Sequence, residues 1–393
     1  MQRKQSISMG RSILAVAMVV VGIGCAVAQL ARGGLKPALT QTAAPSAAPD
    51  AQQVPEMARI ENGKVETHAV AGNLDTALRE MARKAEKPEW AGYSVDQVAG
   101  EHGVCCDNNW NEGSCGTCRL ERENGGTSGT RHAGGTVKLE GARRLIVLYR
   151  LEAKQVGRIR VASEDCTLDA GGLPFVWLTG VKAGESVAFL ETYARGAEFE
   201  GRGEHRLGHE ALTAIALHAD ASADRALESF VKPEQREELR RQAAFWMGAA
   251  RGKAGLNALQ KMAKTDPSPD VRAHVAFALS VSQEAGAIEE MIRMAHDDTS
   301  THVRGQALFW LAQKAGKKAV GTISGAIEDD PDTEVKKKAV FALSQLPRDE
   351  GVPKLIEVAQ KNRNPEVRKQ AMFWLGQSND PRALQFFEKV LAQ

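Results

Sequence analysis

The sequence has few aromatic residues and almost no excess of charge of either sign. Aromatic residues make up 5% of the 393 residues, which leaves few large side chains to anchor a core. Its 51 basic and 49 acidic residues nearly cancel. Without a strong positive field, a nucleic-acid partner is disfavoured. The hydrophobic content of 43% is typical of globular proteins, and the length favours at least two domains.

The sequence also lacks a recognisable catalytic or metal-binding constellation. Five histidines are scattered without metal-ligand spacing: His102, His132, His205, His209 and His218. The glycine pairs at 125–126 and 134–135 lack the strand and helix that flank a phosphate-binding loop. We therefore predict a protein that is not an enzyme and binds no cofactor.

The N-terminus has the pattern of an export signal. Three basic residues within the first eleven precede an apolar run over 13–24, and small residues follow at 26–28. This pattern predicts a signal peptide over 1–28 and a periplasmic or extracellular protein. Two alternatives are an uncleaved membrane anchor and a lipoprotein signal ending at Cys25, although Gly22 stands where that signal prefers a large aliphatic residue.

The next stretch, residues 29–58, is rich in Ala, Pro and Gln and shows no hydrophobic period, which predicts a flexible linker. A small α+β domain is predicted over 59–196. Its expected elements are a strand at 65–69, a helix at 74–82, a hairpin of strands at 145–151 and 156–161, a strand at 175–178 and a helix capped by Ser186.

Self-similarity dominates the C-terminal half. Five ten-residue blocks each begin 32 residues after the last: Leu239-RRQAAFWMG248, Val271-RAHVAFALS280, Val303-RGQALFWLA312, Val335-KKKAVFALS344 and Val367-RKQAMFWLG376. A second apolar series, which includes Leu256, Ile288, Val320, Val352 and Leu384, recurs on the same period. Each repeat is therefore predicted to be a pair of short helices. A divergent first repeat is predicted at 207–238, so the solenoid covers 207–393.

The turn before each block carries a shared motif. Asp266, Asp298 and Asp330 each precede a Val-Arg or Val-Lys pair by five residues, and Asn362 takes the same place before Val367. The pattern resembles HEAT-like repeats of the bilin-lyase type. The resemblance implies a mostly α-helical fold, an α-solenoid whose second helices line a concave surface for partners. It also implies an Asp–Arg ladder between repeats, which Lys336 and Asn362 are expected to weaken.

The eighth block position alternates between large and small side chains, in the order Trp246, Ala278, Trp310, Ala342, Trp374. This alternation predicts complementary packing between neighbouring repeats. A ligand role for the indoles is the less favoured interpretation, because an apolar stripe at helical spacing usually belongs to the core.

The cysteines allow three interpretations. Cys105, Cys106, Cys115, Cys118 and Cys166 lie in the predicted α+β domain. The C-x-x-C at 115–118 lacks the strand–helix context of a redox motif, and the adjacent pair at 105–106 makes a poor zinc knuckle. Export favours disulfides, with one of the five left over if Cys25 is removed with the signal peptide. A redox or zinc function at the C-x-x-C stays an alternative.

The predicted function is a scaffold of the cell envelope that holds a protein partner. A helical wheel of the second helices predicts an exposed, mixed-charge face formed by Lys261, Lys264, Arg293, His296, Glu357, Gln360 and Lys389. Ile292 and Ile356 are either apolar anchors at its edge or part of the core. One alternative is a solvated face without a partner. Another is a chromophore-handling factor related to bilin lyases, which the export signal opposes.

Overall fold

A computed structural model describes residues 57–100, 104, 117–121, 143–196 and 207–392. The predicted signal peptide and all but the last two residues of the predicted linker lie outside these ranges. From Pro55 onward the chain forms one compact unit. Within the described residues, no helix is both long enough and apolar enough to span a membrane.

The N-terminal part of this unit contains two small sheets with strand orders β1-β7-β4 and β2-β8-β3-β5-β6. The strands are β1 (Arg59–Glu61), β2 (Val65–Ala69), β3 (Glu89–Asp96), β4 (Thr117–Arg119), β5 (Arg144–Glu152), β6 (Gln155–Ser163), β7 (Thr167–Asp169) and β8 (Phe175–Thr179). The predicted hairpin is confirmed, because β5 and β6 pair antiparallel. Ala153 and Lys154 turn it with positive φ, as a two-residue hairpin loop requires.

Among the described residues of this part, two helices accompany the sheets, α2 (Leu74–Lys84) and α3 (Ala183–Ala194). Asn73 caps α2 by accepting a hydrogen bond from the Thr76 amide at 2.8 Å. The predicted cap of α3 is wrong. The helix begins three residues before Ser186, whose side chain is buried and engaged in a tertiary hydrogen-bond chain instead.

That chain of hydrogen bonds joins the sheet to the first solenoid helices. The Tyr149 and Tyr93 hydroxyls lie 2.8 Å apart, Tyr93 and Ser186 lie 2.6 Å apart, and Ser186 Oγ lies 2.8 Å from His218 Nε2. His218 Nδ1 lies 2.7 Å from the Ala214 carbonyl oxygen. All four side chains are buried, so no substrate reaches the Ser–His pair, and the network is structural.

We expect the network to make the fold sensitive to acid. Burial lowers the pKa of His218 from 6.5 to about 4. Between these pH values, the unfolded chain therefore binds a proton at this histidine that the folded protein does not bind. Stability is therefore complete above the unfolded pKa and falls as the pH drops from 6.5 towards 4, by about 2 to 3 kcal/mol. Urea unfolding at several pH values measures this, and His218→Gln should flatten the profile. An unchanged slope in that variant contradicts the assignment.

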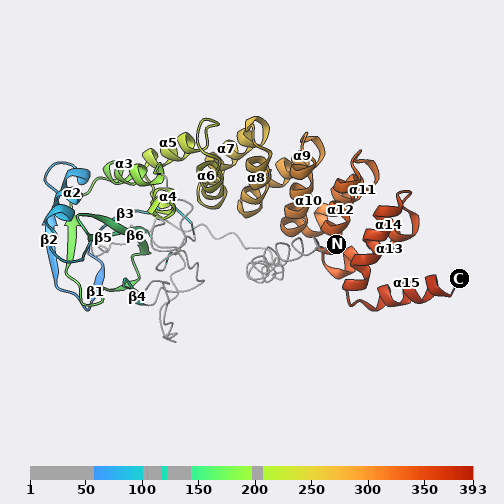
Figure 1. Cartoon of the computed structure of the whole chain (residues 1–393), viewed down its shortest axis with the longest axis horizontal. Helices are drawn as coiled ribbons and strands as arrows, with labels where there is room; N and C mark the ends of the chain where they lie inside the picture. Colours follow the sequence, from blue (N-terminus) through green and yellow to red (C-terminus); the bar gives the residue numbers. More distant parts are fainter. Residues whose placement is uncertain (1–56, 101–103, 105–116, 122–142, 197–206, 393) are drawn as a thin grey trace, which may run out of the picture. The chain divides into compact units, whose positions relative to one another are not determined.

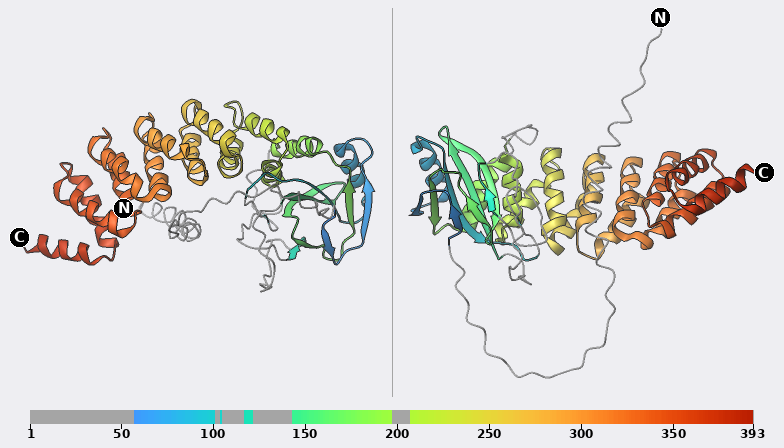
Figure 2. Two further views of the ribbon diagram at one scale, coloured as in Figure 1. Left: turned by 180° about the vertical axis from the view of Figure 1, so that it is seen from behind. Right: turned by 90° about the horizontal axis from the view of Figure 1, so that it is seen from below.

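The C-terminal part consists of consecutive helix pairs. The helices are α4 (Leu207–Leu217), α5 (Ala221–Phe230), α6 (Glu237–Ala250), α7 (Gly252–Thr265), α8 (Pro269–Val281), α9 (Gly286–Asp297), α10 (Thr301–Ala315), α11 (Val320–Asp329), α12 (Thr333–Ser344), α13 (Arg348–Lys361), α14 (Pro365–Gln377) and α15 (Pro381–Leu391), with a short 3₁₀ turn η1 (Gly316–Ala319). The right-hand view in Figure 2 shows the pairs in series. The predicted α-solenoid is confirmed, and α4 and α5 form its divergent first pair.

The sheet packs directly on this first pair. The Val98 amide donates to the Leu217 carbonyl at 2.8 Å, the Ala219 amide donates to the Asp96 carbonyl at 3.0 Å, and Glu210 accepts from the Ile159 amide at 3.1 Å. Apolar side chains continue without a break from Leu74 in α2 to Phe386 in α15. The N-terminal end of the helix stack is therefore covered by the protein's own sheet.

The first and second helices of the repeats differ in how closely they approach their neighbours. Consecutive first helices α6, α8, α10 and α12 pack tightly, whereas consecutive second helices α7, α9 and α11 scarcely touch. A Cβ added at Gly248 in α6 would lie 2.0 Å from the Ala278 carbonyl oxygen in α8. Elements on the inside of a bend approach more closely than those outside it. Figure 1 shows α8, α10 and α12 along the inner edge of the arc and α9 and α11 along its outer edge. The expectation that the second helices line the concave surface is wrong.

Candidate protein-binding face

The exposed side of the inner helices carries one phenylalanine per repeat at the same position. We call these five residues the aromatic stripe: Phe245, Phe277, Phe309, Phe341 and Phe373. Four of the rings are half-buried, and Phe373 is 54% exposed. Each lies two residues before a fully buried apolar residue such as Leu279, hence on the opposite side of its helix. The rings therefore lie on the face that points away from the second helices.

The rings form one connected row through contacts with the tryptophans. Phe245 and Phe277 stack directly, with centroids 5.8 Å apart, and Phe309 stacks on Phe341 at 5.6 Å. Between these stacks, Trp310 touches Phe277 at 4.7 Å and Phe309 at 4.9 Å. Trp374 bridges Phe341 and Phe373 in the same way, at 4.8 and 5.0 Å.

The alternation of Trp and Ala explains the two kinds of contact. Where Ala278 or Ala342 occupies the eighth block position, the neighbouring phenylalanines stack on each other. Where that position holds Trp310 or Trp374, the indole lies against the phenylalanine of the preceding repeat. Neighbouring repeats therefore pack in the alternating way that the sequence predicts, with the indoles of Trp310 and Trp374 lying between phenylalanine rings along the surface. The half-burial of these two indoles places them at the edge of the core.

Polar side chains flank the aromatic stripe on the same helices. Amide side chains occupy two positions beside it, in the columns of Gln242, Gln306 and Gln370 and of Gln313, Gln345 and Gln377. His274 shares the first column, and burial lowers its pKa from 6.5 to about 4, so it is neutral at pH 7. Acidic residues begin most of the helices, and salt bridges pair Glu238 with Arg241 and Glu334 with Lys337. The face therefore combines rings with hydrogen-bonding groups and little net charge.

A ladder of bidentate ion pairs holds successive repeats in register. Each arginine in the opening turn of one first helix binds the aspartate before the next: Arg240 to Asp266 (2.8 and 3.1 Å), Arg272 to Asp298 (2.8 and 3.0 Å) and Arg304 to Asp330 (2.7 and 3.0 Å). Each aspartate also accepts from the backbone amide two residues later, as Asp298 does from Ser300 at 2.8 Å. One carboxylate thus fixes both the turn and the neighbouring helix.

Residues 223–312 and 320–393 match the family described as HEAT repeats. The chain is a HEAT-like repeat protein. It is similar in fold to human deoxyhypusine hydroxylase in complex with glycerol, at 15% identity over 53% of this chain and 90% of that one, with a TM-score of 0.28. It is also similar to the CpcE–CpcF complex of phycocyanin lyase from Nostoc sp. PCC7120, at 18% identity over 51% and 79% of the two chains, with a TM-score of 0.28. No curated protein matches significantly.

The ladder of this HEAT-like repeat protein ends where its motif departs from the pattern. Lys336 donates to the Glu328 carbonyl oxygen at 2.6 Å and does not reach Asn362. The Asn362 amide instead donates to the Glu328 carboxylate at 3.1 Å. The expected weakening is therefore observed, and the turn survives because Asn362 still accepts from the Asn364 amide at 3.0 Å.

Restoring the motif is expected to restore the pair. Asn362→Asp alone should destabilise the protein, because it sets a second carboxylate beside Glu328. Combining it with Lys336→Arg should recover that loss and give a favourable coupling energy of about 1 to 3 kcal/mol between the two sites. A double-mutant cycle from urea unfolding measures this coupling. Additive effects of the two substitutions would contradict the role of the motif.

The predicted second-helix face of this HEAT-like protein lies on the outer side of the solenoid. Lys261, Lys264, His296, Glu357, Gln360 and Lys389 are exposed, and Arg293 is half-buried against Glu290. Ile292 and Ile356 are half-buried and pack against the main core. The wheel thus identified the exposed side of these helices, but the tight packing of the first helices turns that side outward. Binding by these residues stays a prediction.

Two of the five predicted disulfide cysteines fall within the described residues. Cys118 and Cys166 are both buried and disulfide-bonded, which leaves neither sulfur free to hold zinc. Cys105, Cys106 and Cys115 lie outside the described residues. Across the part of the chain that the structure describes, no group of three or more His, Cys, Asp or Glu side chains is placed to hold a metal ion.

The sequence patterns did not single out the aromatic stripe as a site. Every block contains its phenylalanine at the seventh position, which is the signal that could have found it. A ring at the same position of all five repeats is equally expected of a core column. Each first helix packs against other helices on most of its surface, however. Only the tertiary packing shows that the phenylalanine column lies on the side that the other helices leave uncovered.

Proposed function

We propose that this protein is a non-enzymatic binding scaffold that holds a protein partner on the inner face of its solenoid. The aromatic stripe carries the proposal. Half-buried rings supply apolar contact area at small entropic cost, because the packing already fixes them. The glutamines beside them supply hydrogen bonds that orient a partner. Such a combination of rings and polar groups is typical of protein–protein interfaces.

The charges on this face favour a protein over a nucleic acid. Glu238, Asp270, Glu334 and Glu366 line the edge where the inner helices begin. Phosphate groups lying across the stripe would approach this acidic edge. Arg241 and Lys337 are already paired with carboxylates and hold little free charge for phosphates. A partner whose surface mixes apolar and polar groups fits the face best.

We place the scaffold in the cell envelope, in the periplasm or outside the cell, on the basis of the N-terminal signal pattern. The disulfides at Cys118 and Cys166 favour the same location, since such bonds persist in oxidising compartments. Retention of the apolar run as an anchor would keep the scaffold at the membrane surface, with the same binding face.

Capture from envelope extract tests the proposal with a matched pair of variants. The stripe variant replaces Phe277, Phe309 and Phe341 with Leu, which keeps apolar volume and removes the rings. We expect it to lose about tenfold or more in capture of the partner that the wild type retains. The control variant replaces Lys261 and Lys264 on the outer face with Glu and should capture normally. Both proteins should show unchanged helical circular dichroism.

Equal capture by the stripe variant and the wild type would overturn the proposal for the inner face. Loss in the control variant alone would return the binding site to the second helices, as the helical wheel predicted. Arg293 is left intact in the control, because reversing its charge would leave the buried Glu290 beside another carboxylate.

A further inference from the structure

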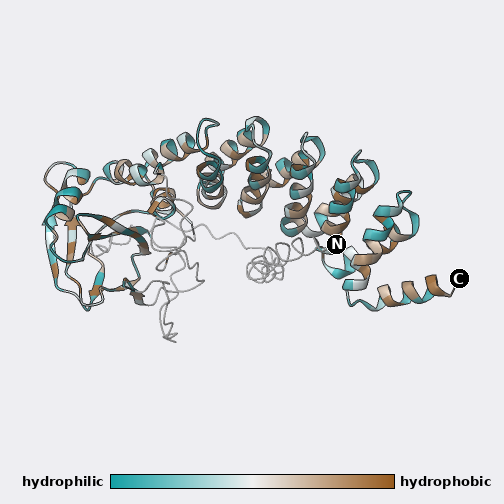
Figure 3. Cartoon of the chain, viewed as in Figure 1, coloured by the Kyte–Doolittle hydropathy of each residue, from teal (hydrophilic) through white to brown (hydrophobic). Residues whose placement is uncertain are grey.

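The middle of the aromatic stripe combines stacked rings with polar side chains on both sides. Phe309 and Phe341 are half-buried, their centroids lie 5.6 Å apart and their planes are 4° from parallel, so they form one continuous apolar patch across α10 and α12. Polar side chains lie one helical turn before and one turn after these rings: Gln306, Lys338, Gln313 and Gln345. Figure 3 shows apolar and hydrophilic residues side by side on these two helices.

Two of these polar groups have no partner within the part of the chain that the structure describes. The Gln306 amide makes no hydrogen bond there, and Lys338 makes neither a hydrogen bond nor a salt bridge. The Lys338 side chain crosses Gly305 of the preceding repeat, where an added Cβ would lie 2.2 Å from its Cδ and 3.2 Å from its Nζ. The absence of a side chain at Gly305 thus lets the ammonium lie close to α10, beside the rings. A ligand on the stripe would meet one available amide and one available cation.

The spacing of the repeats restricts the conformation of such a ligand. The first helices α6, α8, α10 and α12 pack tightly in series, and helices packed in this way lie about 8 to 10 Å apart. A ligand that makes the same contact in successive repeats must carry equivalent groups at this interval. A polyproline II helix does so, because its turn of three residues rises about 9 Å. A β-strand presents the same side every two residues, about 7 Å, and does not match.

Hydrogen bonding separates a polyproline II ligand from an α-helical one. An α-helix could match the interval with side chains seven residues apart, about 10 Å, but its backbone groups bond to one another. The polyproline II backbone has no internal hydrogen bonds, so its carbonyl oxygens need donors. Gln306 can supply one, and so can Gln313, whose amide reaches Gln345 only at 3.5 Å. Proline also removes the backbone N–H groups that such a ligand would otherwise leave unpaired.

We propose, on the basis that the inner face is the binding face, that the partner protein binds through a proline-rich segment in the polyproline II conformation. The five rings span about 36 Å, the length of about twelve residues in this conformation. Prolines and apolar side chains of the segment pack on the rings. An acidic residue of the segment pairs with Lys338, and this pair sets the direction in which the segment lies.

Fluorescence anisotropy of labelled peptides with the purified protein tests the proposal. The probe is a peptide of about twelve residues made of Pro-Pro-Leu triplets, with glutamate in place of one leucine. We expect it to bind at least about tenfold more tightly than a Gly-Ser peptide or a helix-forming peptide of the same length and charge. The same proline peptide with glutamine in place of the glutamate should bind about three- to fivefold more weakly, as an exposed ion pair allows.

Three variants assign these differences to named side chains. Replacing Phe309 and Phe341 with Leu should weaken the proline peptide by about tenfold without changing circular dichroism. Lys338→Met keeps the side chain across Gly305 but removes the charge, so the glutamate and glutamine peptides should then bind equally. Lys264→Met, the matched change at an exposed lysine of the outer helices, should preserve the preference for glutamate.

Four outcomes overturn the proposal: no detectable binding of the proline peptide, equal binding of the Gly-Ser peptide, tighter binding of the helix-forming peptide, or a glutamate preference that survives Lys338→Met. These results are distinct from a failure of the inner face itself. If the stripe variant still loses the partner captured from envelope extract, the inner face stands as the binding face and only the conformation or charge of the bound segment is wrong.

Discussion

Asp298→Ala is expected to lower the free energy of unfolding by about 3 to 5 kcal/mol. The substitution leaves the Arg272 guanidinium, which is mostly buried, without its bidentate partner at 2.8 and 3.0 Å. It also removes the carboxylate oxygen that accepts a hydrogen bond from the backbone amide of Ser300. Ser300 is the residue immediately before the first turn of helix α10. The pKa of Arg272 is raised by its hydrogen bond to this carboxylate, so the arginine stays charged and the cost is not relieved by deprotonation. Urea unfolding at pH 7 measures the loss.

The adjacent residue provides the control. The Asp297 side chain is 53% exposed and its carboxylate pairs with the exposed His296, so Asp297→Ala should change stability by less than about 0.5 kcal/mol. Similar small losses in both variants would mean that the ladder is a surface feature. Apolar packing alone would then set the register of the repeats.

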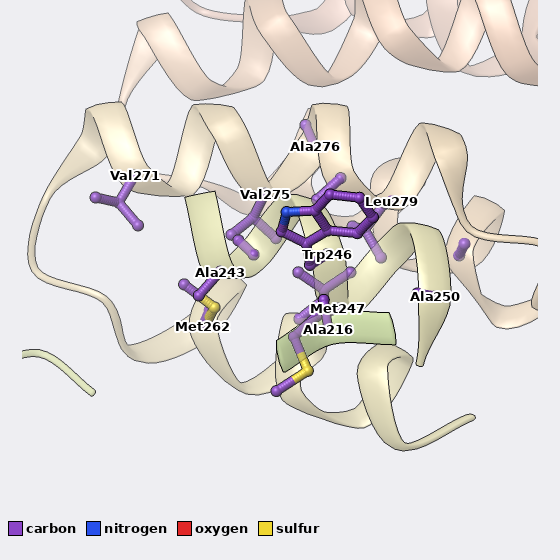
Figure 4. Close-up of a cluster of buried hydrophobic side chains, with 14 of the residues drawn as sticks. Ala216, Ala243, Trp246, Met247, Ala250, Met262, Val271, Val275, Ala276 and Leu279 are labelled. Carbon is purple, nitrogen blue, oxygen red and sulfur yellow. The ribbon is translucent and has the colours of Figure 1, made fainter. Parts of the chain in front are cut away.

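Trp246→Ala is the second large effect, with an expected loss of about 3 to 5 kcal/mol. Trp246 is 2% exposed, and Figure 4 draws its ring within a cluster of buried side chains that includes Val275 and Leu279 of α8. Removing the indole opens a cavity between the first two complete repeats. Chemical denaturation followed by circular dichroism measures the loss.

Trp310→Ala is the matched comparison at the same repeat position. Trp310 is half-buried on the aromatic stripe, so its removal creates an open depression and should cost about 2 kcal/mol. Equal losses for the two substitutions would contradict the assignment of Trp246 to the core and of Trp310 to its edge.

The sequence was sufficient to predict the helix pairs, because their patterns are local. The 32-residue period places each first helix with no reference to the rest of the chain, and side chains cap three of these helices, at Ser268, Asp332 and Asn364. The resemblance to HEAT-like repeats also implied the ladder and its weakening at Lys336 and Asn362. These features depend on contacts between neighbouring repeats, which the period itself specifies.

The curvature could not be predicted in the same way. A helical wheel identifies the buried side of each helix, but the direction of bending depends on the distances between helices of successive repeats. Those distances depend on small residues at the helix contacts, such as Gly248, which lets α6 approach the backbone of α8 at Ala278. Such close approaches are known only once the helices are packed. The helical wheel therefore identified the exposed side of the second helices but could not show that this side lies on the outer surface of the solenoid.

In the N-terminal part, contacts between residues far apart in the sequence likewise could not be predicted. Strand β8 pairs in parallel with both β2 and β3, which lie far from it in the sequence. The role of Ser186 also depends on such contacts, since Tyr93 and His218 come from distant segments. Serine is a preferred N-cap residue near the start of a helix, but the Ser186 side chain here forms tertiary hydrogen bonds instead.

Site-specific photo-crosslinking can locate the surface of the solenoid that binds the partner protein. A photoreactive amino acid is placed at single exposed positions of the full-length protein in cells, at Gln313 and Gln377 beside the aromatic stripe and at Lys261 and Gln360 on the outer helices. The account predicts that the two inner positions crosslink to the same partner protein and that the two outer positions do not. Crosslinks confined to Lys261 and Gln360 would contradict binding on the inner face.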